Sequence, residues 1–252
     1  MIEVQSISKS FNGVQVLEDI SARFEQGKVN LIIGQSGSGK TVLLKTIVGL
    51  HVPDSGTILY NNRDFFSLTT TKKKELRQEI GMLFQGSALF DWATVEENVR
   101  FPLDYFTNWS MLKKQKRVLF CLERVQLLKA KKLMPGELSG GMQKRVAIAR
   151  AISINPKYLF CDEPNSGLDP QTSGVIDNLI LEITKEYGMT TIVNTHDLNS
   201  VLAIGERINF IKDGKKWWEG DKESILSTDN TELRSYLLAS EVVRKANLLE
   251  DH

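Results

Sequence analysis

Apolar and polar residues change their spacing several times along the chain, and each change predicts a different kind of element. Residues 1–33 alternate apolar and polar positions around turn signals such as Asn12-Gly13, which is typical of short strands. Residues 29–33 form a short β-rich run that ends at Gly34, and apolar residues then recur at helical spacing up to Leu50. The predicted order is therefore strand, glycine loop and helix.

The second half of the chain returns to alternating strands and helices after a different middle part. Residues 55–85 predict further strands and a polar helix over 70–78. Within residues 156–225, strands are predicted by three short apolar runs, at 158–161, 190–194 and 208–211. The last of these is followed by Asp213-Gly214, which indicates a hairpin.

The middle part, residues 88–154, is rich in helical patterns and basic. It holds 12 Lys and Arg against 6 Asp and Glu, a net charge of 12 − 6 = +6. The sequence thus predicts a single domain with an α/β core, residues 1–87 and 155–225, split by a helical subdomain over 88–154. Residues 226–252 predict a C-terminal helical extension, with apolar residues at helical spacing: Leu233, Leu237, Leu238, Val242 and Val243.

Composition narrows the class of protein. The 252 residues are 41% hydrophobic, with a formal net charge of +1, so there is no global signature of a nucleic-acid partner and we expect none. The longest apolar stretches fall well short of the ~20 residues of a membrane span, and the N-terminus lacks the pattern of a signal peptide. A cytosolic chain is expected. Its two cysteines, Cys121 and Cys161, are interpreted as reduced packing residues.

The glycine loop matches the phosphate-binding pattern G-x-x-x-x-G-K-[ST], with Gly34, Gln35, Ser36, Gly37, Ser38, Gly39, Lys40 and Thr41. Glycines let the backbone curl so that several N–H groups point at phosphate oxygens, and the helix that follows presents its positive end to the same anion. Lys40 can reach the β- and γ-phosphates, and Thr41 offers a hydroxyl to Mg²⁺. The alternative is a chance glycine turn before a helix.

Two carboxylates follow the predicted strand at 158–161. Asp162 is suited to the Mg²⁺ shell, and Glu163 is suited to orient and deprotonate an attacking water. In a parallel sheet the end of this strand faces the same crevice as the phosphate loop. The alternative, a strand that ends in an exposed acidic turn, loses weight because a phosphate loop lies upstream.

A second anion-binding pattern lies at residues 138–142. Ser139, Gly140 and Gly141 precede an apolar-striped helix, and a serine with two glycines at a helix N-terminus can bind an anion. A single nucleotide does not need two such sites unless the second one serves the ATP of a partner. The alternative, which stays open at this point, is an ordinary N-cap with glycines for the turn.

Together these motifs resemble the ATP-binding subunits of ABC transporters, over essentially residues 1–225. The resemblance implies a P-loop NTPase (RecA-like) core with an N-terminal antiparallel β subdomain and the inserted helical subdomain that carries the signature. It implies further roles: Gln85 in the Q-loop, on Mg²⁺ and the attacking water; Ser139, Gly140 and Gly141 on the γ-phosphate of the opposite subunit; residues 166–169 as the D-loop at the dimer interface; His196 on the γ-phosphate; and Phe11 stacked on adenine.

Some of these positions also have simpler interpretations. Phe11 could be a core residue, Gln85 could be a surface residue, and His196 could simply precede a helix. Two departures from the family pattern stand out, Met142 where glutamine is commoner and Asn165 where threonine or serine is frequent. Neither removes a group that contacts phosphate, and Glu163 and His196 fill the base and switch positions, so we expect an active ATPase.

The resemblance also implies a working assembly. Two chains would bind two ATP molecules with Mg²⁺ at their shared interface, beneath an integral-membrane permease on the cytoplasmic face of the inner membrane. The stretch after Gln85, together with residues 138–142, is similar to the Mce-associated phospholipid-transport ATPases, which also pair with an Mce-type lipid-binding protein. The basic helical subdomain fits a position near acidic headgroups, or equally a solvated helical surface.

Other functions stay open. An ATPase subunit of an amino-acid or methionine importer has a similar segment after the Q-loop. An ABC ATPase that acts on ribosomes or DNA would usually carry two cassettes or a long coiled coil, whereas this chain has one cassette and no heptad run. A nucleoside kinase would leave Ser139, Gly140 and Gly141 without a purpose.

Overall fold

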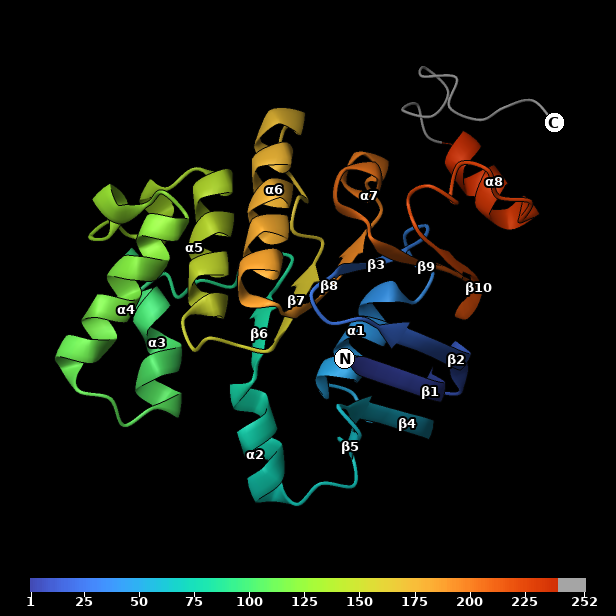
Figure 1. The fold of residues 1–252 in the computed structure, drawn as a ribbon, viewed down its shortest axis with the longest axis horizontal. Helices are drawn as coiled ribbons and strands as arrows, with labels where there is room; N and C mark the ends of the chain where they lie inside the picture. Colours follow the sequence, from blue (N-terminus) through green and yellow to red (C-terminus); the bar gives the residue numbers. More distant parts are fainter. Residues whose placement is uncertain (240–252) are drawn as a thin grey trace. The chain divides into compact units, whose positions relative to one another are not determined.

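The computed structural model describes residues 1–239, which form two compact units. Unit 1 consists of residues 1–69 and the described residues 190–239, and unit 2 consists of residues 70–189. Within the described residues, the predicted runs form elements of the expected type (Figure 1). These elements form an antiparallel sheet, a set of parallel strands and a group of helices, as the sequence predicts.

Unit 1 opens with a four-stranded antiparallel sheet in the order β2-β1-β4-β5. Its strands are β1 (Ile2–Phe11), β2 (Val14–Phe24), β4 (Ser55–Tyr60) and β5 (Arg63–Asp64). The first two strands are longer than the sequence predicts, at 10 and 11 residues. Ser6 and Asp19 adopt positive φ angles of 48° and 49°, and the register of the pair shifts near both. These bulges interrupt the alternation, so the sequence reads as several short strands.

A second sheet in unit 1 carries the glycine loop. It contains β3 (Val29–Ile33) between its parallel neighbours β8 (Thr190–Thr195) and β9 (Arg207–Lys212), and β10 (Lys215–Gly220) completes the hairpin with β9. All five residues of β3 are buried, as expected of a central parallel strand. The helices of unit 1 are α1 (Lys40–Val48), α7 (Leu198–Ile204) and α8 (Thr231–Leu238).

Unit 2 pairs two parallel strands with a group of helices. The strands are β6 (Ile80–Leu83) and β7 (Tyr158–Asp162), and every residue of β7 is buried. The helices are α2 (Thr70–Gln78), α3 (Val95–Phe106), α4 (Met111–Arg124), α5 (Gly140–Ile152) and α6 (Pro170–Tyr187), with short 3-10 turns at Leu128–Ala130 and Pro135–Glu137. Helices α3, α4 and α5 lie side by side (Figure 1). The polar helix over 70–78 is confirmed.

The packing roles predicted for the cysteines are confirmed, because Cys121 and Cys161 are both buried free thiols. Burial raises the pKa of Cys121 to about 11 and raises that of Cys161 further still. Across residues 1–239, the structure contains no helix of the length and apolar character that a membrane crossing requires.

The described part of the C-terminal extension packs on its own chain. Leu233 and Leu237 of α8 are buried, and the Tyr236 ring lies 5.3 Å from that of Phe210. The Tyr236 hydroxyl donates to the backbone oxygen of His196 at 3.2 Å. Leu238 is exposed. Val242 and Val243, which the sequence analysis also places on this helix, lie outside the described residues.

The side chain of Asn98 on α3 makes hydrogen bonds to the backbone of the segment that precedes this helix. Its Oδ1 accepts from the Phe90 N–H at 2.8 Å, and its Nδ2 lies 3.0–3.1 Å from three backbone oxygens, those of Phe90, Ala93 and Thr94. The side chain is fully buried, so Asn98→Ala leaves several buried polar groups without a partner. We expect the free energy of unfolding to fall by about 3 kcal/mol in urea titrations. Asn108→Ala, at an exposed position, is the control, and equal effects of the two would contradict the prediction.

Candidate functional site

The glycine loop of unit 1 has the backbone that a phosphate cradle needs. Gly34, Gly37 and Gly39 have φ angles of 148°, 82° and 101°, in the region that side chains rarely adopt. A Cβ atom on Gly34 would lie 2.1 Å from the backbone oxygen of Ile211. The pattern predicted from the sequence is therefore built as a loop between β3 and α1 whose backbone conformation and close packing require glycine.

Helix α1 begins directly at the loop. Gly39 is its N-cap and supplies no side chain, so the first N–H groups of the helix are left for an anion. Lys40 is only 5% exposed, and its Nζ donates to the backbone oxygens of Gly34 and Gln35 at 2.9 and 2.8 Å. The lysine thus lies folded along the loop, with its charge where phosphates would enter.

Two hydroxyl groups complete this half of the site. Ser38 Oγ is buried and, among the described residues, makes no hydrogen bond, which leaves it able to bind an incoming phosphate. The Thr41 hydroxyl accepts from Asn194 Nδ2 at 3.1 Å, so Asn194 at the end of β8 orients the group predicted to meet Mg²⁺. Asn194 carries no motif signal, because the sequence shows it only as the last residue of a predicted strand.

The remaining candidates of unit 1 lie on the surface. Phe11, at the end of β1, is 38% exposed and stands edge-on to His51 with 5.3 Å between the ring centroids, which excludes its interpretation as a core residue. His196 is exposed and directly precedes Asp197, the N-cap of α7. Both rings are accessible, and their contacts with nucleotide stay predictions.

The carboxylates of unit 2 stand at the end of β7, as predicted. Asp162 is the last, buried residue of the strand, and Glu163 follows with a φ angle of 49°. A non-glycine residue in this conformation is held there by its surroundings, and such strain concentrates at functional sites. The exposed acidic turn is therefore a poor description, because Asp162 is buried and Glu163 is half-buried.

Gln85 lies just after β6, and its main chain is fixed by a residue that the sequence analysis did not single out. The side chain of Gln85 is exposed, whereas its backbone oxygen accepts from the buried Nζ of Lys144 on α5. Arg150, also on α5, donates to the backbone oxygens of Ser87 and Ala88, each at 2.7 Å. Neither cation carries a motif signal, because a Lys or Arg on a helix of this kind predicts solvent exposure.

The second anion-binding pattern is formed as a helix start. Ser139 is the exposed N-cap of α5, and its Oγ accepts from the Met142 N–H at 3.3 Å. A Cβ atom on Gly141 would lie 2.5 Å from the Thr172 side chain, so this glycine permits close packing of α5 on α6. The N-cap interpretation is therefore correct for the chain by itself. Contact with the ATP of a partner stays a prediction.

One departure from the family pattern, Asn165, makes a buried hydrogen bond to the neighbouring helix. Asn165 is buried, and its Nδ2 donates to Asp177 Oδ1 on α6 at 2.8 Å. In the predicted D-loop, Asp169 is the N-cap of α6, and its Oδ1 accepts from the Thr172 N–H at 3.0 Å. Hydrogen bonds from Thr172 hold the pKa of Asp169 below its usual value.

The structure thus assembles two half-sites. In unit 1 it brings together the glycine loop, Lys40, Thr41 and Asn194. In unit 2 it brings Lys144 to Gln85, Asp162 and Glu163. A phosphate loop that precedes a helix, in a chain that also has an acidic pair after a buried strand, defines a P-loop nucleotide hydrolase.

Comparison with known proteins specifies the class. The sequence model of the ABC transporter family matches residues 17–166, well over half of the chain. The chain belongs to the ABC transporter family, as an ATP-hydrolysing subunit that energises transport.

Three relatives illustrate the similarity. The chain is 39% identical over 237 residues to the methionine import ATP-binding protein MetN of Clostridioides difficile, covering 94% of this chain and 74% of MetN. It is 37% identical over 237 residues to the intermembrane phospholipid transport ATP-binding protein MlaF of Haemophilus influenzae, covering 94% and 90%. A dimeric structure of the ATP-binding cassette MJ0796 with ADP and phosphate aligns with a TM-score of 0.81 at 33% identity, covering 88% and 99%.

The two named transporters carry different cargoes at nearly equal identity. The similarities therefore show that this chain is the ATPase subunit of a transporter, and they are shared by transporters of both substrates.

Proposed function

We propose that two copies of this chain bind two ATP molecules at a shared interface, each between the Lys40 loop of one copy and the Ser139 loop of the other. The observation that carries the proposal is the presence in one chain of two separate helix starts with glycines, at Gly39 and at Ser139, where a second anion could bind. The dimeric structure of the MJ0796 cassette with ADP and phosphate supports a nucleotide-bound dimer. ATP then joins the two copies, and its hydrolysis separates them.

Hydrolysis is assigned to the groups of both units. Glu163 takes the proton of the attacking water, Gln85 and His196 orient the water and the γ-phosphate, and Lys40 neutralises developing charge. Mg²⁺ would be held by Thr41, Asp162 and Gln85, and when bound it neutralises charge on the phosphates. The donor set fits, because Mg²⁺ prefers a few protein oxygens together with phosphates and water.

A cavity in unit 2 supports a permease partner. Its volume is about 360 Å³, and its walls come from β6, α3, α5 and the segment after Gln85. The lining is mostly apolar and aromatic, and it includes Phe84, Phe90, Phe101, Phe106 and Arg150. Such a groove suits an amphipathic helical segment of a membrane protein. We propose that the permease inserts a segment here, with the chain peripheral on the cytoplasmic face of the inner membrane.

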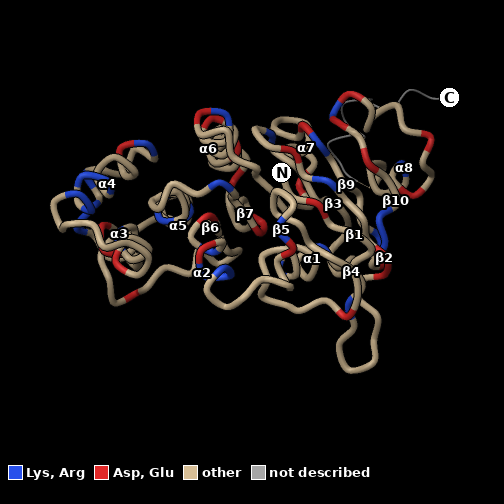
Figure 2. Tube along the Cα trace, turned by 60° about the horizontal axis from the view of Figure 1, so that its bottom comes forward, with Lys and Arg blue, Asp and Glu red and all other residues tan. Residues whose placement is uncertain are grey.

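Phospholipid is the cargo that the surface beside this groove favours. Residues 100–120 hold five basic residues and one acid, Asp104, which is already paired with Lys114 and Arg100 at 2.9 Å each. Tyr105 and Leu112 are 66% and 64% exposed, and Lys113 Nζ lies 4.0 Å from the centre of the Trp109 ring. Lys and Arg residues lie along α4 (Figure 2). Exposed aromatic and apolar residues among cations are typical of surfaces near anionic headgroups.

The similarity to MlaF supports this cargo, and an Mce-type lipid-binding protein completes the proposed system. The second candidate is an importer of methionine, which the similarity to MetN supports.

Phe101→Asp tests the groove. Phe101 lines the cavity, is exposed, and packs against Phe90 with 4.7 Å between the ring centroids. A buried carboxylate at the centre of an apolar contact is costly, so recovery of the permease with the tagged chain from detergent-solubilised membranes should fall at least about tenfold. The measurement is quantitative mass spectrometry of the co-purified proteins and lipids.

Trp217→Asp is the matched control, because Trp217 on β10 is an exposed aromatic outside both the groove and the basic surface, and its replacement should leave recovery unchanged. Recovery of a permease, an Mce protein and phospholipid supports the lipid system. Recovery of a methionine permease retains the ATPase mechanism and removes the lipid cargo. A chain recovered with ribosomes or nucleic acid, and no permease, contradicts the transport function of this chain.

A further inference from the structure

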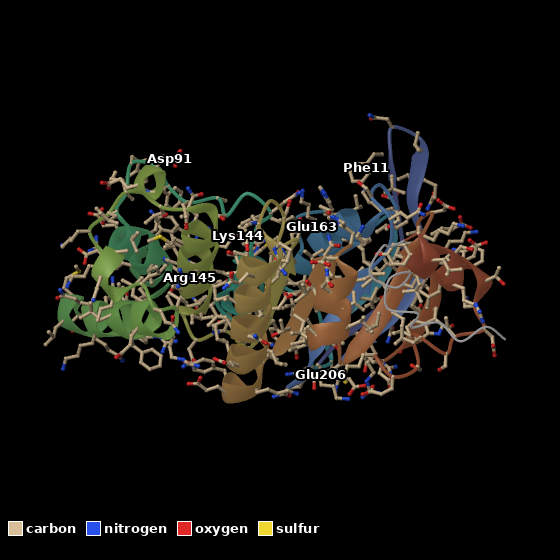
Figure 3. All side chains as sticks on the ribbon, turned by 90° about the horizontal axis from the view of Figure 1, so that it is seen from above. Phe11, Asp91, Lys144, Arg145, Glu163 and Glu206 are labelled. Atoms are coloured by element: carbon tan, nitrogen blue, oxygen red, sulfur yellow. The ribbon has the colours of Figure 1, made fainter. Side chains whose placement is uncertain are left out.

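Lys144 is a buried lysine among the groups assigned to hydrolysis. It is 4% exposed, and its Nζ donates to the backbone oxygen of Gln85. Burial lowers the pKa of Lys144, while the negative charges of Asp162 and Glu163 act in the opposite direction. In the view of Figure 3, Lys144 on α5 lies nearer to Glu163 than Arg145 does. A charge kept in such a place is costly, so its surroundings must compensate it.

We propose that Lys144 is a positioning residue for ATP hydrolysis, which holds the main chain at Gln85 and the carboxylates of Asp162 and Glu163 in one fixed arrangement. The hydrogen bond to Gln85 fixes the start of the loop, and the ammonium charge offsets the repulsion between two adjacent carboxylates. Gln85 and Glu163 act on the same water in the proposed mechanism. Fixing the position of one relative to the other therefore raises the rate of the chemical step.

Arg150 shows that the loop is anchored to α5 at more than one point. It is buried, and its two bonds to Ser87 and Ala88 hold the loop two and three residues beyond Gln85. Burial lowers the pKa of Arg150. The feature particular to Lys144 is its charge near Asp162 and Glu163, in addition to a main-chain bond.

The decisive variant is Lys144→Gln, which retains a side-chain donor for the Gln85 oxygen and removes the charge. Loss of an orienting group behind a reacting group typically lowers activity about 10- to 100-fold. We expect kcat to fall by that factor, and the KM for ATP to stay within about twofold, because Lys144 contributes nothing to the phosphate loop. Lys144→Arg retains the charge and should recover most of kcat. Melting temperatures are measured for every variant.

Arg145→Gln is the matched control. Arg145 is the next cation on α5, and its Nη1 also donates to a backbone oxygen, that of Val125, at 3.2 Å. The variant should hydrolyse ATP at the wild-type rate. Three outcomes overturn the proposal: an unchanged kcat in Lys144→Gln, a raised KM with kcat unchanged, or equal losses of kcat in Lys144→Gln and Lys144→Arg that follow their melting temperatures.

The inference rests on the proposed role of Glu163, and Glu163→Gln measured alongside separates the two. Full activity of Glu163→Gln removes the role of the base. Loss of activity in Glu163→Gln together with full activity in Lys144→Gln overturns the role of Lys144 alone. If Lys144→Gln fails to fold, Lys144→Met at reduced temperature gives the same split between kcat and KM.

Discussion

Replacing Lys40 by alanine is expected to remove both ATP binding and ATP hydrolysis. The Lys40 ammonium group lies along the glycine loop, bonded to Gly34 and Gln35 oxygens, in a position that is almost completely buried. When a phosphate enters the loop, Lys40 exchanges its hydrogen bonds to neutral backbone oxygens for bonds to charged phosphate oxygens. Charged acceptors bind the ammonium group more strongly. Removal of such a preorganised group costs about 10²–10³ in rate. Titration with a fluorescent ATP analogue and a phosphate-release assay measure the two effects.

Lys45→Ala is the control for this prediction. Lys45 lies on the same helix, α1, in its last turn, where its charge is distant from the anion-binding end. Its replacement should leave both binding and hydrolysis close to wild type. ATP binding by Lys40→Ala at the wild-type affinity would show that the loop is not the principal phosphate site, whatever its backbone conformation.

The backbone of this half-site could be predicted from the sequence because its causes are local. Residues 29–50 contain all the signals: a buried strand rich in β-branched residues, three glycines at fixed spacing and an apolar helical stripe. Patterns between neighbouring residues are therefore enough to predict this backbone. The same holds for β7 and its two terminal carboxylates, and for the polar helix over 70–78. In each of these the residues that decide the conformation are neighbours in the chain.

The supporting residues could not be predicted in this way, since their partners are remote in sequence. Lys144 is 59 residues from Gln85, and Asn194 is 153 residues from Thr41. Only the tertiary fold brings such pairs together. Lys144 occupies a polar position of an amphipathic helix, which predicts solvent exposure, and the fold buries it. The bulges at Ser6 and Asp19 were missed for a related reason, because backbone irregularities follow from pairing with remote strands.

Glu163→Gln is expected to stop hydrolysis while it preserves ATP binding. The amide has the size and shape of the carboxylate and can adopt the same φ of 49°, but it cannot take a proton from water. Loss of a general base lowers the rate about 10²–10⁴-fold, and the phosphate loop, which binds the nucleotide, is unchanged. Glu182→Gln, at an exposed position on α6, is the control and should hydrolyse ATP normally.

The same variant tests how ATP joins two copies. If ATP lies between the Lys40 loop of one copy and the Ser139 loop of the other, Glu163→Gln should accumulate as an ATP-bound dimer, because the event that separates the copies no longer occurs. Size-exclusion chromatography with light scattering measures this mass. Adding Ser139→Glu places a negative charge at the start of α5, where it repels the γ-phosphate and should return the protein to a monomer. A dimer that persists in the double variant would show that α5 of the partner does not contact ATP. Hydrolysis by Glu163→Gln at the wild-type rate would show that another residue is the general base.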